Sequence, residues 1–97
     1  MKLPVAQTDN FIIYLEHYKD FVWLHTDVYK WSPKIKKVFT SILDHIQQTL
    51  QSDLLGLVDN DKLGKFGKAI GFNFYKTVLG YDNKEYDVFI RRNKWVA

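Results

Sequence analysis

The chain has 97 residues, of which 46% are hydrophobic, 16% aromatic and 26% charged, and its net charge is +3. This length favours one domain with one core, and so apolar a composition excludes a disordered chain. The chain has no cysteine and no run of about 18 apolar residues, which excludes disulfides, zinc–thiolate sites, a cysteine nucleophile and a membrane-spanning helix.

The first ten residues read as a lead-in before the first element. They hold Pro4 and the turn-like sequence Thr-Asp-Asn, and they lack the apolar segment of a signal peptide. Two runs rich in β-forming residues follow at 11–17 and 21–31, and the Tyr-Lys-Asp between them indicates a hairpin. Apolar side chains alternate onto both faces of the first run, which predicts strands covered on both sides.

The most regular pattern in the sequence predicts an amphipathic helix over 33–51. Ser32 is a suitable N-cap, and Pro33 suits the first helical position, where an N–H group would have no partner anyway. Apolar residues then recur at spacings of three and four, as expected for the buried face of a helix. The residues of this face are Ile35, Val38, Phe39, Ile42, Leu43, Ile46 and Leu50.

The second half of the chain predicts one more buried strand, a short helix and a closing pair of strands. Residues 53–59 form a short apolar run, which we expect to pair in parallel with the strand before the long helix. Leu63, Phe66 and Ile70 have helical spacing, and Gly71 suits the left-handed residue after a helix end. The final strands are expected at 72–80 and 85–92. The predicted order is β–β–α–β–α–β–β, a mixed α/β fold with a central sheet of about five strands.

This order resembles the C-terminal two-thirds of a GNAT acyltransferase domain. The run DND…FGKAIGF places Asn60, Phe66, Gly71 and Phe72 where that family often has an asparagine, an aromatic residue in a helix and a Gly-Phe pair. The resemblance covers about residues 11–92. It implies that the chain, 1–97, forms a single truncated GNAT-like domain.

Short GNAT-like proteins of tailed bacteriophages, including internal-virion and assembly-type proteins, show a closer resemblance. Those proteins have a strand that ends in a tryptophan, a basic helix, and a Lys-x-Ile-Gly run before the closing hairpin. In this chain the matching residues are Trp31, Lys34, Lys36, Lys37 and 68–72. The resemblance implies a viral protein that acts in the host cytoplasm or in the virion, away from membranes.

The cofactor of the GNAT family is acetyl-coenzyme A, whose pyrophosphate binds a glycine-rich loop at the N-terminus of the long helix. Here the two glycine places hold Pro33 and Ile35. Proline has no N–H to donate, and a branched side chain blocks close approach to the backbone. We therefore expect no cofactor. If acetyl-coenzyme A binding were retained, the residues to hold it would be Ser32, Lys34, Lys36 and Lys37.

Catalytic candidates are few. Tyr75 and Tyr81 are the candidates for the general-acid tyrosine that the resemblance implies, and ordinary surface tyrosines are the alternative reading. The three histidines lack metal-ligand spacing, so we expect no metal site. Glu16 and Asp27 are expected on different faces of the first hairpin, which argues against a histidine–carboxylate pair there.

The function expected from these features is non-catalytic protein binding. Trp31 and Trp95 lie at element ends, where exposed tryptophans often anchor interfaces, and Lys62, Lys65 and Lys68 form a basic edge on the short helix. The partner would be a phage or host protein. The family has a further strand and two helices before this point, so a second copy of the chain could cover the exposed sheet edge. The alternatives are a minimal acetyl-coenzyme A-dependent N-acyltransferase and a basic nucleic-acid-binding protein.

Overall fold

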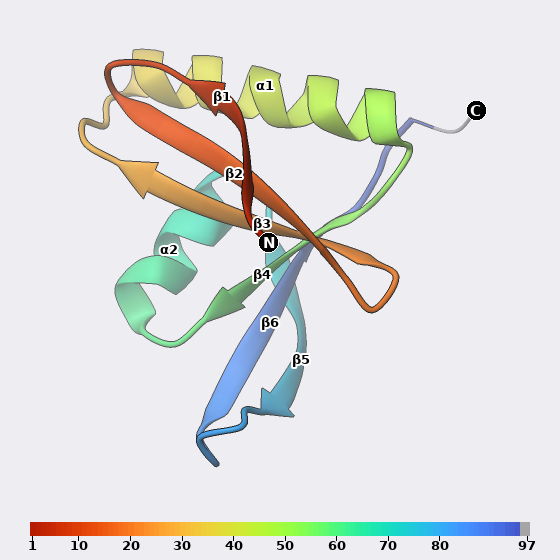
Figure 1. Ribbon diagram of the computed structural model, residues 1–97. Coiled ribbons are helices and arrows are strands. Elements are labelled where there is room, and N and C mark those ends of the chain that lie inside the picture. Colours follow the sequence, from red (N-terminus) through yellow and green to blue (C-terminus); the bar gives the residue numbers. More distant parts are fainter. Residues whose placement is uncertain (96–97) are drawn as a thin grey trace.

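The computed structural model describes residues 1–95 (Figure 1). Within them, six strands and two helices follow in the order β1 (Leu3–Gln7), β2 (Phe11–Tyr18), β3 (Phe21–Val28), α1 (Pro33–Leu50), β4 (Leu54–Val58), α2 (Asp61–Ala69), β5 (Asn73–Leu79) and β6 (Glu85–Arg91). The strands form one sheet in the order β1-β2-β3-β4-β6-β5. Only the central pair, β3 and β4, is parallel in this described part of the chain. The mixed α/β fold and the order of its last seven elements are therefore confirmed.

The prediction that residues 1–10 are a lead-in is wrong, because Leu3–Gln7 forms the edge strand β1. It pairs antiparallel with β2, and the register shifts by one residue between Pro4 and Ala6. Proline removes one backbone donor, which an edge strand tolerates, and a bulge interrupts the pairing in the same place. The described sheet therefore has six strands instead of about five.

Both helices pack on the same face of the sheet. Their apolar side chains join one buried cluster with those of β2, β4 and β6, and Phe11, Phe39 and Leu43 are among its fully buried members. The predicted cover on both faces of the first strand is not found. Its even-numbered side chains are half-buried or exposed, on a face that carries no helix within residues 1–95. We call the two sides of the sheet the helix face and the open face.

Side chains cap the N-termini of both helices, and Ser32 does so as predicted. Ser32 Oγ accepts a hydrogen bond from the Ile35 amide at 3.1 Å, and Asn60 Oδ1 accepts one from the Leu63 amide at 2.8 Å. Gly71 has a φ of +97°, the left-handed conformation expected after a helix end. These caps place the N-termini of α1 and α2 directly after β3 and β4, at the same end of the parallel pair.

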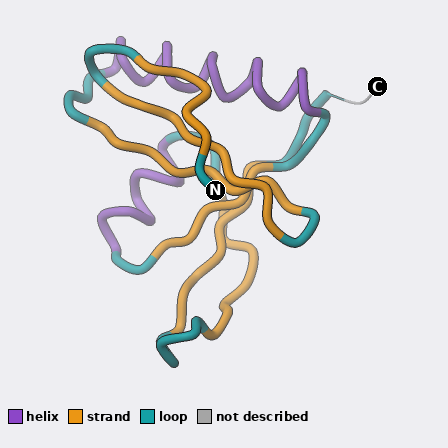
Figure 2. The backbone as a smooth tube through the Cα atoms, viewed as in Figure 1, coloured by secondary structure: helices purple, strands orange, loops and turns teal. Residues whose placement is uncertain are grey.

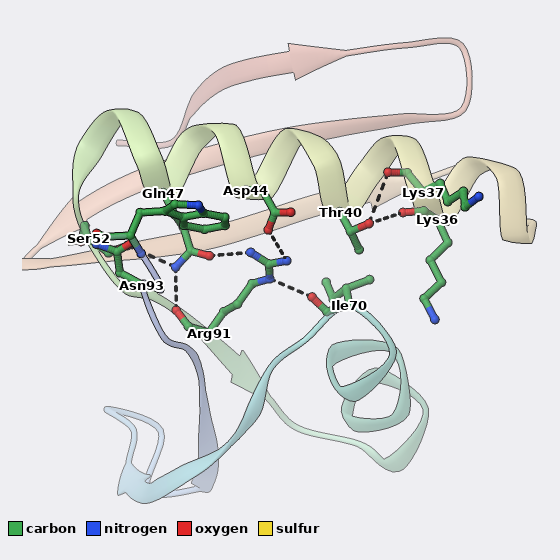
Figure 3. A network of polar contacts seen from close by, with 10 residues as sticks. Lys36, Lys37, Thr40, Asp44, Gln47, Ser52, Ile70, Arg91 and Asn93 are labelled. Atoms are coloured by element: carbon green, nitrogen blue, oxygen red, sulfur yellow. Dashed lines mark hydrogen bonds and ion pairs between the residues drawn. The ribbon is translucent and has the colours of Figure 1, made fainter. Parts of the chain in front are cut away.

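A partly buried group of polar side chains ties α1 to β6 and to the end of α2 (Figure 3). We call it the polar clamp; it consists of Asp44, Gln47, Arg91 and the carbonyl of Ile70. Arg91 Nε donates to the Ile70 carbonyl at 2.9 Å, and its Nη1 donates to Gln47 Oε1. The Gln47 amide in turn donates to the Arg91 carbonyl at 2.8 Å. Asp44 Oδ1 lies 2.8 Å from Arg91 Nη2, close enough for an ion pair but not aligned as a hydrogen bond.

Candidate binding site between diverging strands

The parallel strands β3 and β4 pair over only two residues. Val22 pairs with Leu54 and Trp23 with Leu55, and the two strands then separate toward their C-terminal ends (Figure 2). On its far side β3 stays paired with β2 over its whole length, and β4 stays paired with β6. The sheet is therefore split in its middle, and we call this split the β3–β4 opening.

Backbone groups of both strands face this opening. The two-residue turn at Lys19 and Asp20 makes Tyr18 and Phe21 a hydrogen-bonded pair, and hydrogen-bonded pairs then recur at every second residue. By this alternation His25 points its N–H and C=O at β2, while Thr26 points its own toward β4. Because pairing with β4 has already ended at Trp23 and Leu55, the Thr26 groups lie at an open strand edge.

An apolar pocket of about 530 Å³ borders the opening on the helix face; we call it the helix-side pocket. Trp31 forms its wall, with ring centroids 5.5 Å from Phe39 and 5.0 Å from Phe66, both in edge-to-face contact. The loop that carries Trp31 is held because the amides of Tyr29 and Lys30 both donate to the Asn10 carbonyl. The lining residues are Thr26, Val28, Tyr29, Lys30, Trp31, Asn60, Lys62, Leu63 and Phe66.

A second pocket, of about 440 Å³, lies at the other mouth of the opening; we call it the open-side pocket. Thr26 and Leu63 line both pockets, so the two pockets are neighbours on either side of these two side chains. The residues around this second pocket are Lys2, Tyr14, Leu24, His25, Thr26, Asp27, Leu57 and Leu63. The opening therefore has a pocket on each side.

Two polar pairs on the open face lie beside this pocket, and neither was predicted from the sequence. His25 Nε2 lies 2.9 Å from Glu16 Oε1, and the Tyr14 hydroxyl donates to Asp27 Oδ2 at 2.8 Å. The prediction that Glu16 and Asp27 lie on different faces is wrong, because the register pairs even-numbered residues of β2 with odd-numbered residues of β3. The hydrogen bond with His25 lowers the pKa of Glu16, and the hydrogen bond to Asp27 raises the pKa of Tyr14.

We expect the Glu16 carboxyl to titrate below its ordinary pKa, and its pKa to rise in a His25→Leu variant that removes the hydrogen bond. A ¹³C NMR pH titration measures both values. Because folding lowers this pKa, the interaction stabilises the fold above the unfolded-state pKa and is lost as the pH falls through the folded-state value. His17→Leu is the control, since His17 lies on the opposite face of the hairpin. An unchanged Glu16 pKa in the His25 variant would contradict this assignment.

The N-terminus of α1 offers little for a phosphate group. Pro33 has no amide hydrogen, the Ile35 amide donates to Ser32 Oγ, and the Lys36 amide donates to the Ser32 carbonyl. Only the amide of Lys34 is left among the first four of the helix. The side chains of Lys34, Lys36 and Lys37 are exposed on its surface, and none of them lines either pocket of the opening.

The two tyrosines proposed as catalytic candidates lie outside the opening. Tyr75 sits at a bulge in β5, where Arg92 stacks over its ring at 5.4 Å. Tyr81 is 98% exposed in the β5–β6 turn, and its hydroxyl lies 3.4 Å from that of Tyr18. The structure therefore brings neither of them to Glu16 and His25.

The candidate partner-binding residues are spread over several surfaces. Trp31 and Lys62 line the helix-side pocket, whereas Lys65 and Lys68 line a separate pocket that also holds four acidic residues. Trp95 lies beyond the other end of α1, where its amide donates to Asn93 Oδ1 at 3.1 Å. Within residues 1–95 no cluster of side chains has the make-up of a metal site, and neither helix combines the length and hydropathy that crossing a bilayer needs.

No protein-family model and no curated protein sequence matches the chain. Among solved structures, a Bordetella pertussis protein assigned to the GnaT family of acetyltransferases superposes with a TM-score of 0.63. The two sequences are 11% identical over 86% of this chain and 57% of that protein, so this chain spans little more than half of its length. A likeness at this identity speaks for the fold alone. The fold of the described residues is GNAT-like, as the resemblance in the order of the elements predicts.

Proposed function

We propose that the chain is a non-catalytic GNAT-fold protein that takes an extended segment of a protein partner into the β3–β4 opening. One observation carries the proposal: open backbone edges stand between two neighbouring pockets, one of which is apolar and aromatic. An extended peptide bonds to such edges through its main chain, while neighbouring pockets receive alternate side chains.

The surroundings of the opening support binding without chemistry. Among the first four residues of α1 only Lys34 has an amide without a partner, and Pro33 has no N–H to donate to a phosphate. Tyr75 and Tyr81 lie away from the opening. Under this proposal the protein needs no cofactor. In the phage setting that the sequence resemblance implies, the partner is a virion, assembly or host protein.

The test is a selection of random decapeptides, displayed on phage, against the immobilised chain. We expect binders whose affinity falls at least about tenfold for Leu63→Glu, because Leu63 lines both pockets and a charge there disrupts both. Leu63 is 37% exposed, so this variant should fold, which circular dichroism checks. Lys65→Glu is the matched control, since Lys65 is on α2 but outside the opening. Failure to select binders, or binders that ignore the Leu63 change, would refute the proposal.

A second candidate function is a minimal acetyl-coenzyme A-dependent N-acyltransferase. The observation that favours it is the Glu16–His25 pair, which places a proton acceptor at the open-side pocket of the same opening. Thermal unfolding with acetyl-coenzyme A separates the two functions. A ligand at 100 times its Kd adds about 2.7 kcal/mol of stability. The binding function predicts no shift; a shift in the wild type that is lost in Leu63→Glu would favour the enzyme.

A further inference from the structure

We infer that the partner segment carries an acidic side chain two residues away from an apolar one, both directed into the helix-side pocket. The inference rests on the proposed function and adds the chemistry of the partner. It follows from the charges around the opening, from the aromatic wall of the pocket and from the geometry of an extended chain.

The helix-side pocket is positive. Its charged lining residues are Lys30 and Lys62, and no aspartate or glutamate lines it. Both lysines are exposed, and neither takes part in an ion pair within residues 1–95. Two unneutralised cations at one pocket favour an anionic partner through long-range attraction and through direct pairing.

The helix ends add to this potential. Trp31 precedes Ser32, the N-cap of α1, and Asn60 is the N-cap of α2. Both residues line the pocket, so the positive ends of two helix dipoles lie beside it. Asp61, in the first turn of α2, lines the neighbouring pocket instead, together with Lys65 and Lys68. The acid nearest to the α2 N-terminus is thus not among the residues that surround the opening on this face.

The open face has a different charge. Asp27 lines the open-side pocket, with Lys2 and His25 also on its wall. The positive excess is therefore confined to the helix-side pocket, which also sets the direction in which the acid of the partner points.

The apolar part of the helix-side pocket indicates that the second side chain of the partner segment is apolar. Trp31 is 38% exposed and Leu63 37% exposed, and with Phe66 they form an uncovered apolar wall. Residues i and i+2 of an extended chain point to the same side, about 6–7 Å apart. One side chain can therefore contact the aromatic wall while the second faces the lysines. A carboxylate fits this arrangement better than a phosphate, because the capped helix ends leave few amides to surround one.

The probes are the decapeptide that binds most tightly in the selection above and two variants of it. In the amide peptide each Asp is replaced by Asn and each Glu by Gln; in the other variant each Asp and Glu is replaced by Lys. We expect the amide peptide to bind about tenfold more weakly, roughly threefold for each lysine that loses its pair. We expect the Lys30→Gln/Lys62→Gln double variant to lose this preference. Raising the salt concentration from 50 to 500 mM should weaken the acidic peptide more than the amide peptide.

The control is Lys65→Gln/Lys68→Gln, which removes the same charge from the other pocket beside α2. It should keep the preference for the acidic peptide. Selected binders without an excess of Asp and Glu, an amide peptide of equal affinity, or a preference that survives in the Lys30/Lys62 variant would each overturn the inference while leaving the proposed function standing. A selection without any Leu63-dependent binder would instead remove the proposed function itself.

Discussion

Replacement of Arg91 by methionine is expected to lower the free energy of unfolding by about 3 kcal/mol. Arg91 is 6% exposed and is the centre of the polar clamp. Its loss leaves the Gln47 side-chain oxygen and the Ile70 carbonyl without their donors in a buried site, and each such group costs about 1–3 kcal/mol. Asp44, which is 39% exposed in its side chain, can return to water and adds less. Urea denaturation followed by circular dichroism measures the change.

The adjacent arginine supplies the control. Arg92 lies 3.5 Å from Asp53 in an ion pair, but 66% of its side chain is exposed. Such a pair contributes about 0–1 kcal/mol, so Arg92→Met should change the stability by less than about 1 kcal/mol. Equal effects of the two substitutions would mean that the clamp contributes no more than a surface ion pair.

Features that depend on neighbouring residues were predicted from the sequence. The long helix was expected over 33–51 and spans Pro33–Leu50, because its proline, cap and apolar spacing are local signals. The left-handed Gly71 followed for the same reason. The GNAT-like fold was predicted from the resemblance in the order of these elements.

The Glu16–His25 and Tyr14–Asp27 pairs were not predicted because the turn of the first hairpin was expected to be one residue longer than it is. A three-residue turn, Tyr-Lys-Asp, would pair even-numbered with even-numbered residues across the hairpin and separate Glu16 from His25. The actual turn has two residues, Lys19 and Asp20, and pairs Tyr18 with Phe21. A shift of one residue exchanges the faces of a strand, so this error reversed the prediction for the whole hairpin.

The polar clamp and the β3–β4 opening depend on distant parts of the chain. Gln47 does carry a signal, since it follows Phe39 and Leu43 at intervals of four and lies on the buried face of α1. Its partner Arg91 is 44 residues away, and no local pattern joins them. The opening likewise arises where pairing between β3 and β4 stops. The length and the apolar content of the two strands do not predict the residue at which this pairing ends.

Phe39 connects the core to the proposed binding site, and Phe39→Ala is expected to destabilise the fold by about 3–5 kcal/mol. The side chain is fully buried, with edge-to-face contacts to Phe11 at 4.9 Å, Trp31 at 5.5 Å and Phe66 at 5.8 Å. Its removal leaves a cavity beneath the wall of the helix-side pocket. Urea denaturation measures the loss of stability, and the selected decapeptide reports whether the wall keeps its shape.

Val38→Ala is the matched control, one residue earlier on α1 and 47% exposed, and it should cost less than about 0.5 kcal/mol. The decisive comparison is between the decapeptide affinities of the wild type and the two variants, measured in buffer without urea on protein that is folded. If Phe39→Ala folds and binds the decapeptide as tightly as the wild type, Trp31 does not need its contact with the core, and the pocket is not a rigid receptor. If its affinity falls while that of Val38→Ala is unchanged, the aromatic contacts that stabilise the fold also hold the binding surface in place. Core packing and recognition would then depend on the same three rings, those of Trp31, Phe39 and Phe66.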